Sequence, residues 1–207
     1  VDLVVVTIDL RLVPEVIKVC ASKGIHNLVV ISGGGKELGG ERGELEAEIR
    51  RLAQSHDVRV VGPNCIGVMN IACGLVVPFP VLKNVFNKGK ISIISQSGGV
   101  LVDQMVKFAE QGVGLSLAVS IGNKALIREL DMLDYLSEDP ATRVIAFYVE
   151  GFDKNEGRRF VQAAASVPKP IIVLKSGKST EGRRAASSHT ASLAGDHKVF
   201  SSVLAQF

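Results

Sequence analysis

Long apolar runs, blocks of like charge and cysteines are all scarce in this sequence of 207 residues. No apolar run reaches the roughly 18 residues of a membrane-spanning helix, so we expect no membrane segment. The formal net charge is only +3, and no block of about five or more like charges occurs, which argues against nucleic-acid binding. The three cysteines fit neither a zinc site nor a disulfide framework, and they indicate reduced thiols in a cytoplasmic protein.

The sequence contains instead a regular alternation of short apolar runs and helical patterns. The apolar runs are typical of strands buried on both faces, and they occur at residues 3–8, 28–31, 58–61, 91–95, 115–120, 144–149 and 170–174. Amphipathic stretches lie between them, at residues 13–22, 44–55, 100–111, 127–136 and 158–166. This alternation predicts an α/β fold made of doubly wound parallel sheets.

The alternation is interrupted between residues 70 and 90, where prolines and asparagines follow no period. We place a domain boundary in the second half of this stretch. Residues 1–84 are then the back half of one α/β domain, and residues 85–207 are most of another. A buried strand at the very start and a helical pattern cut off at Phe207 lead us to expect a piece of a longer protein.

The residues that follow each predicted strand are candidates for a binding site, because ligands of open α/β sheets bind at the strand ends. They are rich in Gly, Ser, Lys and Asn, which offer backbone donors, close approach and positive charge to an anion. They include Thr7, Ser32-Gly33-Gly34-Gly35-Lys36, Gly62-Pro63-Asn64-Cys65, Gly122-Asn123-Lys124 and Lys175-Ser176-Gly177-Lys178.

The sharpest local feature is the segment Ser95-Gln96-Ser97-Gly98-Gly99, where a strand ends and a helix begins. Its glycines would let a phosphate reach the first N–H groups of the helix. A plain strand–helix turn with a capping serine explains these residues equally well. The segment also approaches the nucleophile elbow of serine hydrolases around Ser97, but Ser95 replaces the first glycine of that motif.

Two further residues are candidates for chemistry. His189 stands in a segment of small and polar residues, and a neutral imidazole attacks phosphorus well when basic side chains stabilise the phosphate. Glu150 directly follows the run 144–149, where its carboxylate would face the ligand crevice and hold one imidazole nitrogen. An exposed loop histidine and an ordinary loop glutamate explain the same positions, and composition alone favours that interpretation for His189.

In their order along the chain, these motifs resemble those of the NDP-forming acyl-CoA synthetases, in the ADP-forming acetate–CoA ligase branch of the succinyl-CoA synthetase superfamily. The resemblance covers essentially the whole chain and corresponds to the α-type subunit or region. It is carried by Gly62-Pro63-Asn64-Cys65-Ile66-Gly67, Ser95-Gln96-Ser97-Gly98-Gly99, Tyr148-Val149-Glu150-Gly151, Leu174-Lys175-Ser176-Gly177-Lys178 and Ser188-His189-Thr190-Ala191-Ser192-Leu193-Ala194-Gly195.

The resemblance implies a role for each segment. Residues 1–84 would be the C-terminal part of a Rossmann-like CoA-binding domain, and residues 85–207 a truncated flavodoxin-type ligase domain. His189 would carry a phosphoryl group, oriented by Glu150. The phosphate would be held by Ser95, Gln96, Ser97, Gly98 and Gly99, and the thiol end of CoA would lie near Ser32, Gly33, Gly34, Pro63, Asn64 and Cys65.

The resemblance also implies partners. The complete ligase would interconvert acyl-CoA, NDP and phosphate with acid, CoA and NTP through an acyl phosphate. ATP or ADP and Mg²⁺ would bind to an ATP-grasp β-type subunit or domain rather than to this chain, and we expect an oligomer. The alternative is a non-catalytic regulatory module that binds CoA or acyl-CoA. The presence of His189 argues for the ligase, since relatives fused to an acetyltransferase domain lose this histidine.

Overall fold

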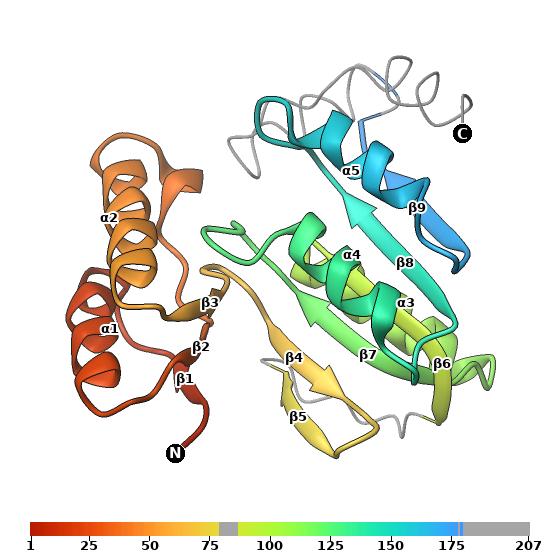
Figure 1. Ribbon diagram of the computed structural model, residues 1–207. Helices are drawn as coiled ribbons and strands as arrows, with labels where there is room; N and C mark the ends of the chain where they lie inside the picture. The colour runs from red at the N-terminus through yellow and green to blue at the C-terminus, as the bar shows by residue number, and fades with distance from the viewer. Residues whose placement is uncertain (79–86, 178, 180–207) are drawn as a thin grey trace.

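The computed structural model describes residues 1–78, 87–177 and 179, and within these ranges the chain forms a three-stranded and a six-stranded sheet (Figure 1). The first lobe comprises the three-stranded sheet with helices α1 (Val13–Ser22) and α2 (Glu41–Ser55). The second lobe comprises the six-stranded sheet with α3 (Gly98–Glu110), α4 (Glu129–Glu138) and α5 (Glu156–Ala164). Among the described residues, no helix is both long and apolar enough to cross a bilayer.

The sheet of the first lobe is parallel, with β2 (Asn27–Val30) between β1 (Val4–Val6) and β3 (Arg59–Val61). Helix α1 has a proline in its first turn, where the missing N–H costs no helical hydrogen bond. Its buried residues Val13, Ile17 and Cys20 follow one face and pack in the same core as the strands. Because β1, β2 and β3 are parallel, the loops that follow them all leave the sheet at the same edge.

The sheet of the second lobe has the order β5-β4-β7-β6-β8-β9. Its strands are β4 (Gly67–Asn70), β5 (Leu75–Pro78), β6 (Lys88–Ser95), β7 (Leu115–Ser120), β8 (Val144–Val149) and β9 (Ile171–Lys175). Strands β6 to β9 are parallel, and their order is that of a flavodoxin-like sheet, whose switch point lies between β6 and β8. Ser95 and Glu150 therefore stand at the switch point, where such sheets bind ligands.

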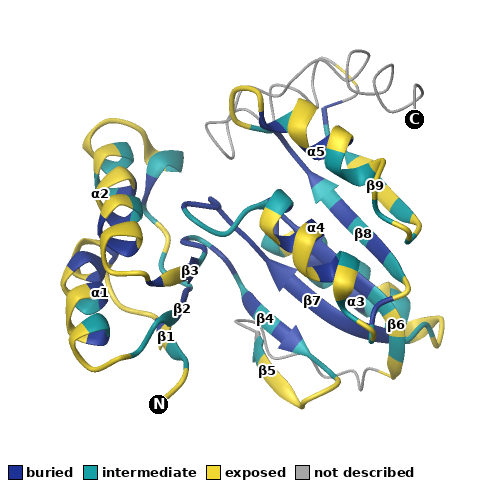
Figure 2. Ribbon diagram, in the orientation of Figure 1, coloured by how far each residue is buried: buried dark blue, intermediate teal, exposed yellow. Residues whose placement is uncertain are grey.

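Both faces of the six-stranded sheet are covered, which confirms the predicted doubly wound α/β class. Ile94 packs in a cluster with residues of α4 and α5, whereas its neighbour Ile93 packs on the other face against α3. Strand β7 is buried at every position (Figure 2). A strand covered on both faces has a largely apolar sequence, and this is why the pattern at residues 115–120 predicted a buried strand.

The hairpin of β4 and β5 is the main element that the sequence pattern did not predict. Its strands are short, and β4 pairs in antiparallel orientation with both β5 and β7. The pairing with β7 joins residues about fifty positions apart, for example Val68 and Val119, and leaves no period in the local sequence. The hairpin belongs to the second sheet although it precedes residue 85, and the domain division at that residue stays a prediction.

Candidate functional site

A cleft of about 520 Å³ lies among the loops that follow β1, β2, β3, β6 and β7. It is lined by Thr7, Ile31, Ser32, Gly33, Asn64, Cys65, Ile66, Gln96, Ser97, Gly98, Gly99 and Asn123. The predicted CoA-side residues Ser32, Gly33, Asn64 and Cys65 and the predicted phosphate-side residues Gln96, Ser97, Gly98 and Gly99 thus share one cavity. The fold brings together two groups of residues that lie about thirty or more positions apart in the sequence.

The start of helix α3 supplies the polar wall of this cleft. The Ser97 hydroxyl accepts a hydrogen bond from the Val100 N–H at 3.4 Å, and the Leu101 N–H donates to the Ser97 carbonyl. The N–H groups of Gly98 and Gly99 have no acceptor within their own helix, and the helix dipole makes this end positive. Space is open where a side chain of Gly99 would stand. A capping serine and an anion cradle are therefore compatible at this turn.

Ser95 and Gln96 are buried and make specific contacts beneath this wall. The Ser95 hydroxyl accepts from the Ser97 N–H at 3.2 Å and donates to the Ser97 carbonyl. The Gln96 Oε1 accepts from the backbone N–H groups of Glu150 and Gly151, at 2.8 and 3.1 Å. Gln96 therefore fixes the start of the loop after β8, and its predicted contact with phosphate stays a prediction.

Glu150 is 5% exposed and lies at the end of β8, beside Gln96 of the cleft wall. Its carbonyl accepts a hydrogen bond from the Lys175 ammonium at 2.7 Å. Burial lowers the pKa of Lys175, and the nearby Glu150 charge opposes this shift. The structure thus places a carboxylate and an ammonium group together at the switch point. His189, the predicted phosphoryl carrier, lies outside the described residues.

Gly34 and Pro63 are the predicted CoA-side residues that do not line the cleft. The Gly34 N–H donates to Glu37 at 2.6 Å, which holds the turn after β2. The Pro63 carbonyl accepts from the Asn123 N–H at 2.9 Å. Both residues support the loops of the cleft, and contact with CoA stays a prediction for them.

Cys65 lines the cleft as a neutral thiol. Its side chain is 4% exposed and donates to the Val30 carbonyl at 3.3 Å. Burial raises the pKa of this thiol to about 11. Because only the thiolate is a good nucleophile, Cys65 contributes packing and shape rather than chemistry.

Four of the residues that line the cleft were given no specific role from the sequence. Thr7 and Asn123 follow strands, and their position at the sheet edge was a usable signal. Ile31 and Ile66 add an apolar surface. Ile66 belongs to the motif from Gly62 to Gly67, but its place in the cleft was not predicted. The Ile66 side chain lies so near Gly98 that a Cβ there would come within 2.5 Å of it. The cleft therefore has an apolar surface beside the polar start of α3.

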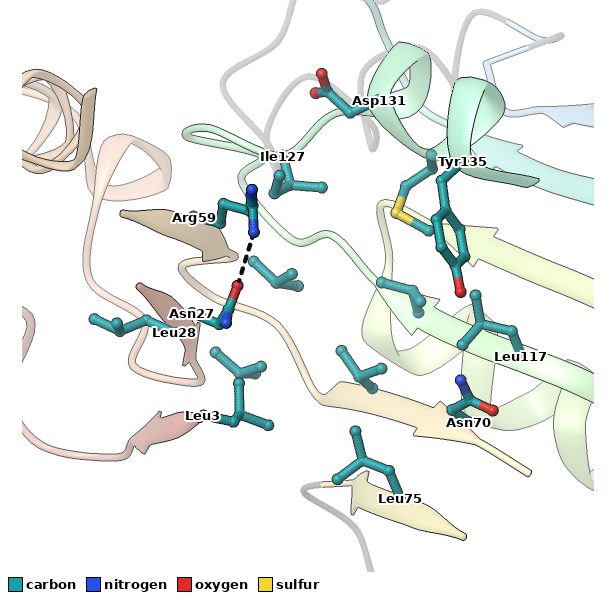
Figure 3. A pocket seen from close by; sticks show the side chains of 15 residues that line it. Leu3, Asn27, Leu28, Arg59, Asn70, Leu75, Leu117, Ile127, Asp131 and Tyr135 are labelled. Carbon is teal, nitrogen blue, oxygen red and sulfur yellow. Dashed lines mark hydrogen bonds between the residues drawn. The ribbon is translucent and has the colours of Figure 1, made fainter. Parts of the chain in front are cut away.

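A second cavity of about 460 Å³ lies between the two sheets and has a different character (Figure 3). Leu3 and Arg59 face it from the first lobe, and Leu117 and Tyr135 face it from the second. Arg59 and Asn27 contact each other at its margin, at 3.4 Å. None of the predicted site residues lines this cavity. The polar cleft is therefore the candidate site.

Two family models match the sequence, a CoA binding domain over residues 1–71 and a succinyl-CoA ligase like flavodoxin domain over residues 88–207. The chain is 40% identical over 208 residues to acetate–CoA ligase (ADP-forming) I of Archaeoglobus fulgidus, and covers 100% of itself and 30% of that protein. It is 38% identical over 208 residues to acetate–CoA ligase (ADP-forming) I subunit alpha of Pyrococcus furiosus, covering 100% of itself and 44% of that subunit.

The structure is also similar to a solved one, the dinucleotide forming acetyl-coenzyme A synthetase 1 of Ca. Korarchaeum cryptofilum in complex with phosphate and ADP. The TM-score is 0.91 at 40% sequence identity, and the match covers 100% of this chain and 44% of that chain. The two family models and these relatives define the class as a CoA-ligase type of α/β protein. The chain belongs to the succinyl-CoA ligase-like family, which confirms the resemblance, and spans less than half of the length of these relatives.

Proposed function

We propose that the chain is the acyl- and phosphoryl-transferring part of an NDP-forming acid–CoA ligase. The observation that carries this proposal is the shared cleft, in which the loops after β2 and β3 face the start of α3. The reaction requires a thioester and an inorganic phosphate at the same place. The cleft offers an apolar surface to the thioester and backbone N–H donors to the phosphate. The relatives named as ADP-forming acetate–CoA ligases support this assignment.

The first step is acyl transfer. A phosphate oxygen attacks the thioester carbonyl carbon, the C–S bond breaks, and CoA leaves as a thiolate that takes up a proton. The N–H groups of Gly98 and Gly99 hold the phosphate, and Asn64 lies at the thioester side of the same cavity. Fixed donors stabilise the charge of the resulting acyl phosphate without reorganising.

The second step is phosphoryl transfer to His189. An imidazole nitrogen attacks phosphorus, the bond from phosphorus to the acyl oxygen breaks, and the carboxylic acid leaves as its anion. Glu150 accepts a hydrogen bond from the other imidazole nitrogen and leaves the attacking one free. In the third step the phosphoryl group passes from His189 to a nucleoside diphosphate, which regenerates the neutral imidazole.

The nucleotide belongs to a partner part in this proposal. An ATP-grasp subunit or domain holds ATP or ADP with Mg²⁺, whose charge offsets that of the phosphates. A relative named as a subunit alpha supports a partner subunit or domain, and we infer an oligomer built from both parts. The acid is a small carboxylic acid that fits the cleft beside CoA. The free thiols of Cys20, Cys65 and Cys73 support a reducing, cytoplasmic location.

The test is the complete reaction of the intact parent protein, or of this chain with its nucleotide-binding partner. Acetyl-CoA is supplied with phosphate, ADP and Mg²⁺, and free CoA thiol and ATP are measured together. The proposal predicts equal amounts of both products, each requiring phosphate and ADP. Tight binding of acetyl-CoA by a folded assembly that forms neither product would support the regulatory module instead.

A further inference from the structure

The loop that follows β7 contacts loops of both lobes (Figure 1). Asn123 and Lys124 in this loop are 4% and 2% exposed, which is exceptional for an amide and an ammonium group. The Asn123 N–H donates to the Pro63 carbonyl at 2.9 Å, and the Ala125 N–H donates to the Gly62 carbonyl at 3.0 Å. Backbone hydrogen bonds alone thus hold the loop against the turn after β3.

The Asn123 side chain is directed to the CoA-side loops. Its Oδ1 accepts from Asn64 at 3.2 Å, and its Nδ2 donates to the carboxylates of Glu37 and Glu46. Its backbone carbonyl accepts from the Lys36 ammonium at 2.7 Å. Since Asn64 lines the cleft, Asn123 sets the orientation of the Asn64 amide and ties it to the turn after β2.

The Lys124 side chain is directed to the loop after β8. Its ammonium contacts both carboxylate oxygens of Glu129 at 3.0 and 3.1 Å, and the Glu156 carboxylate at 3.5 Å. It also donates to the Gly151 carbonyl at 2.8 Å. The Glu129 carboxylate also accepts from Gln96 Nε2, which in turn donates to the Gly151 carbonyl at 2.7 Å. Lysine can only donate and an ionised carboxylate can only accept, so this pair determines which end of the Gln96 amide faces Glu129.

The orientation of Gln96 then determines that of the next loop. With Nε2 bound to Glu129, the Gln96 Oε1 faces the N–H groups of Glu150 and Gly151 and accepts from both. A chain of contacts therefore runs from Lys124 through Glu129 and Gln96 to the backbone of Glu150. Buried ion pairs can often be replaced by apolar residues without loss of stability. Stability alone therefore does not account for the Lys124–Glu129 pair, whereas the positioning of Gln96 does.

We propose that Asn123 and Lys124 are positioning residues that align the two reactions of the cleft. Asn123 holds Asn64 on the side of acyl transfer, and Lys124, through Glu129 and Gln96, holds Glu150 on the side of phosphoryl transfer. The inference rests on the proposed function, since it divides the loop between two steps of that reaction. These two neighbouring residues of one loop thereby fix the acyl-transfer side and the phosphoryl-transfer side of the cleft relative to each other.

The two steps are measurable separately in the intact enzyme. Acyl transfer is followed as phosphate-dependent exchange of labelled CoA into acetyl-CoA, which does not require His189. Phosphoryl transfer is followed as label passing from ATP to His189. Lys124→Met is expected to slow labelling at least tenfold more than exchange, and Asn123→Ala to slow exchange at least tenfold more than labelling.

A double variant separates positioning from a purely structural role. Lys124→Met alone leaves the Glu129 charge buried without its cation, which lowers stability whatever the residue does in the reaction. Lys124→Met with Glu129→Gln removes both charges of this pair and keeps an acceptor for Gln96. Glu156, which also contacts Lys124, keeps Arg128 as its cation at 3.3 Å. The proposal predicts that the double variant recovers most of the melting temperature that Lys124→Met loses. Labelling of His189 in the double variant should nevertheless stay at least tenfold below that of the unsubstituted enzyme.

The outcomes are distinct. Recovery of labelling together with stability in the double variant would overturn the positioning role of Lys124. Equal slowing of exchange and labelling by Asn123→Ala and by Lys124→Met would overturn the division of the loop between the two steps. An unsubstituted enzyme that shows neither exchange nor labelling would overturn the proposed function itself, and the inference with it.

Discussion

At the scale of single residues, the side chains around the cleft divide into those that face the cavity and those that hold them in place. Ser97 and Asn64 face the cavity. Glu37 is one of the supporting residues, since it accepts a hydrogen bond from the Gly34 N–H in the turn after β2. Burial raises the pKa of Glu37, but hydrogen bonds from Asn123 and from backbone N–H groups outweigh burial and lower it overall. A carboxylate so held stays charged near neutral pH and keeps the turn after β2 in one conformation.

Cys65 gives a prediction that depends on burial alone. Because burial raises the pKa of its thiol to about 11, almost none of it is thiolate at pH 8. Iodoacetamide at pH 8 should therefore label the exposed Cys73 in the folded chain and leave Cys65 unmodified, as shown by peptide mass mapping. Chain unfolded in urea is the control, in which both should react. Labelling of native Cys65 as fast as Cys73 would show that the loop after β3 is open.

The residue scale also shows where prediction from the sequence stops. The segment Ser95 to Gly99 was recognisable because it combines a strand end, a capping serine and two glycines. The role of Gln96 was not, since its partners Glu129 and Glu150 are distant in sequence and meet only when α4 and β8 are packed. Polar contacts between elements leave no periodicity, and they are the part of this site that required the structure.

At the scale of elements, the start of helix α3 is the feature on which the proposed phosphate binding depends. Its first two residues are glycines in different surroundings. A Cβ on Gly98 would lie 2.5 Å from Ile66 Cγ2, whereas a Cβ on Gly99 would meet nothing within 4 Å. The two positions thus form a matched pair that separates steric contact from helix propensity.

Gly98→Ala should lower the free energy of unfolding by about 1–3 kcal/mol, because the added methyl group displaces Ile66 from the cleft wall. Gly99→Ala should change it little or stabilise the helix by up to about 1 kcal/mol, since alanine is the better helix former. Urea denaturation of the two variants measures both effects. Equal free energies for the two variants would contradict the packing of Ile66 on α3.

Most elements were predictable from pattern, and the reason is their burial. Strands β7 and β8 are central, and both were expected at their observed bounds. Strand β8 is apolar throughout, and β7 is apolar apart from the buried Ser116 and Ser120. Helix α1 was also expected at its observed bounds, since its apolar face is regular. The hairpin β4–β5 was missed because its register is set by pairing with β7 rather than by its own sequence.

At the scale of the whole molecule, the two lobes are joined where the loop after β7 meets the turn after β3. Gly122 allows this approach, because a Cβ there would lie 2.3 Å from the Pro63 carbonyl oxygen. Its φ of 54° also lies in the left-handed region. Gly112 is a suitable control, since its φ is 69° but a Cβ would meet nothing within 4 Å.

Both glycine-to-alanine variants incur the strain of a left-handed alanine, about 1 kcal/mol. Gly122→Ala should lose about 1–3 kcal/mol more than Gly112→Ala, because it also forces the two loops apart. It should also weaken CoA binding, since Asn64 moves with its loop. Thermal unfolding and CoA titration check the two parts of the prediction. Identical behaviour of the two variants would mean that the lobes do not depend on this contact.

In the proposed reaction of the whole molecule, the phosphoryl group passes through His189. The most direct measurement incubates the assembled enzyme, with its nucleotide-binding part, with labelled ATP and Mg²⁺. Acid lability and peptide mapping then identify the labelled residue. We expect acid-labile, alkali-stable label on His189 that is discharged by ADP and absent from His189→Ala. No label on a folded assembly that binds ATP, or label unchanged in His189→Ala, would contradict it.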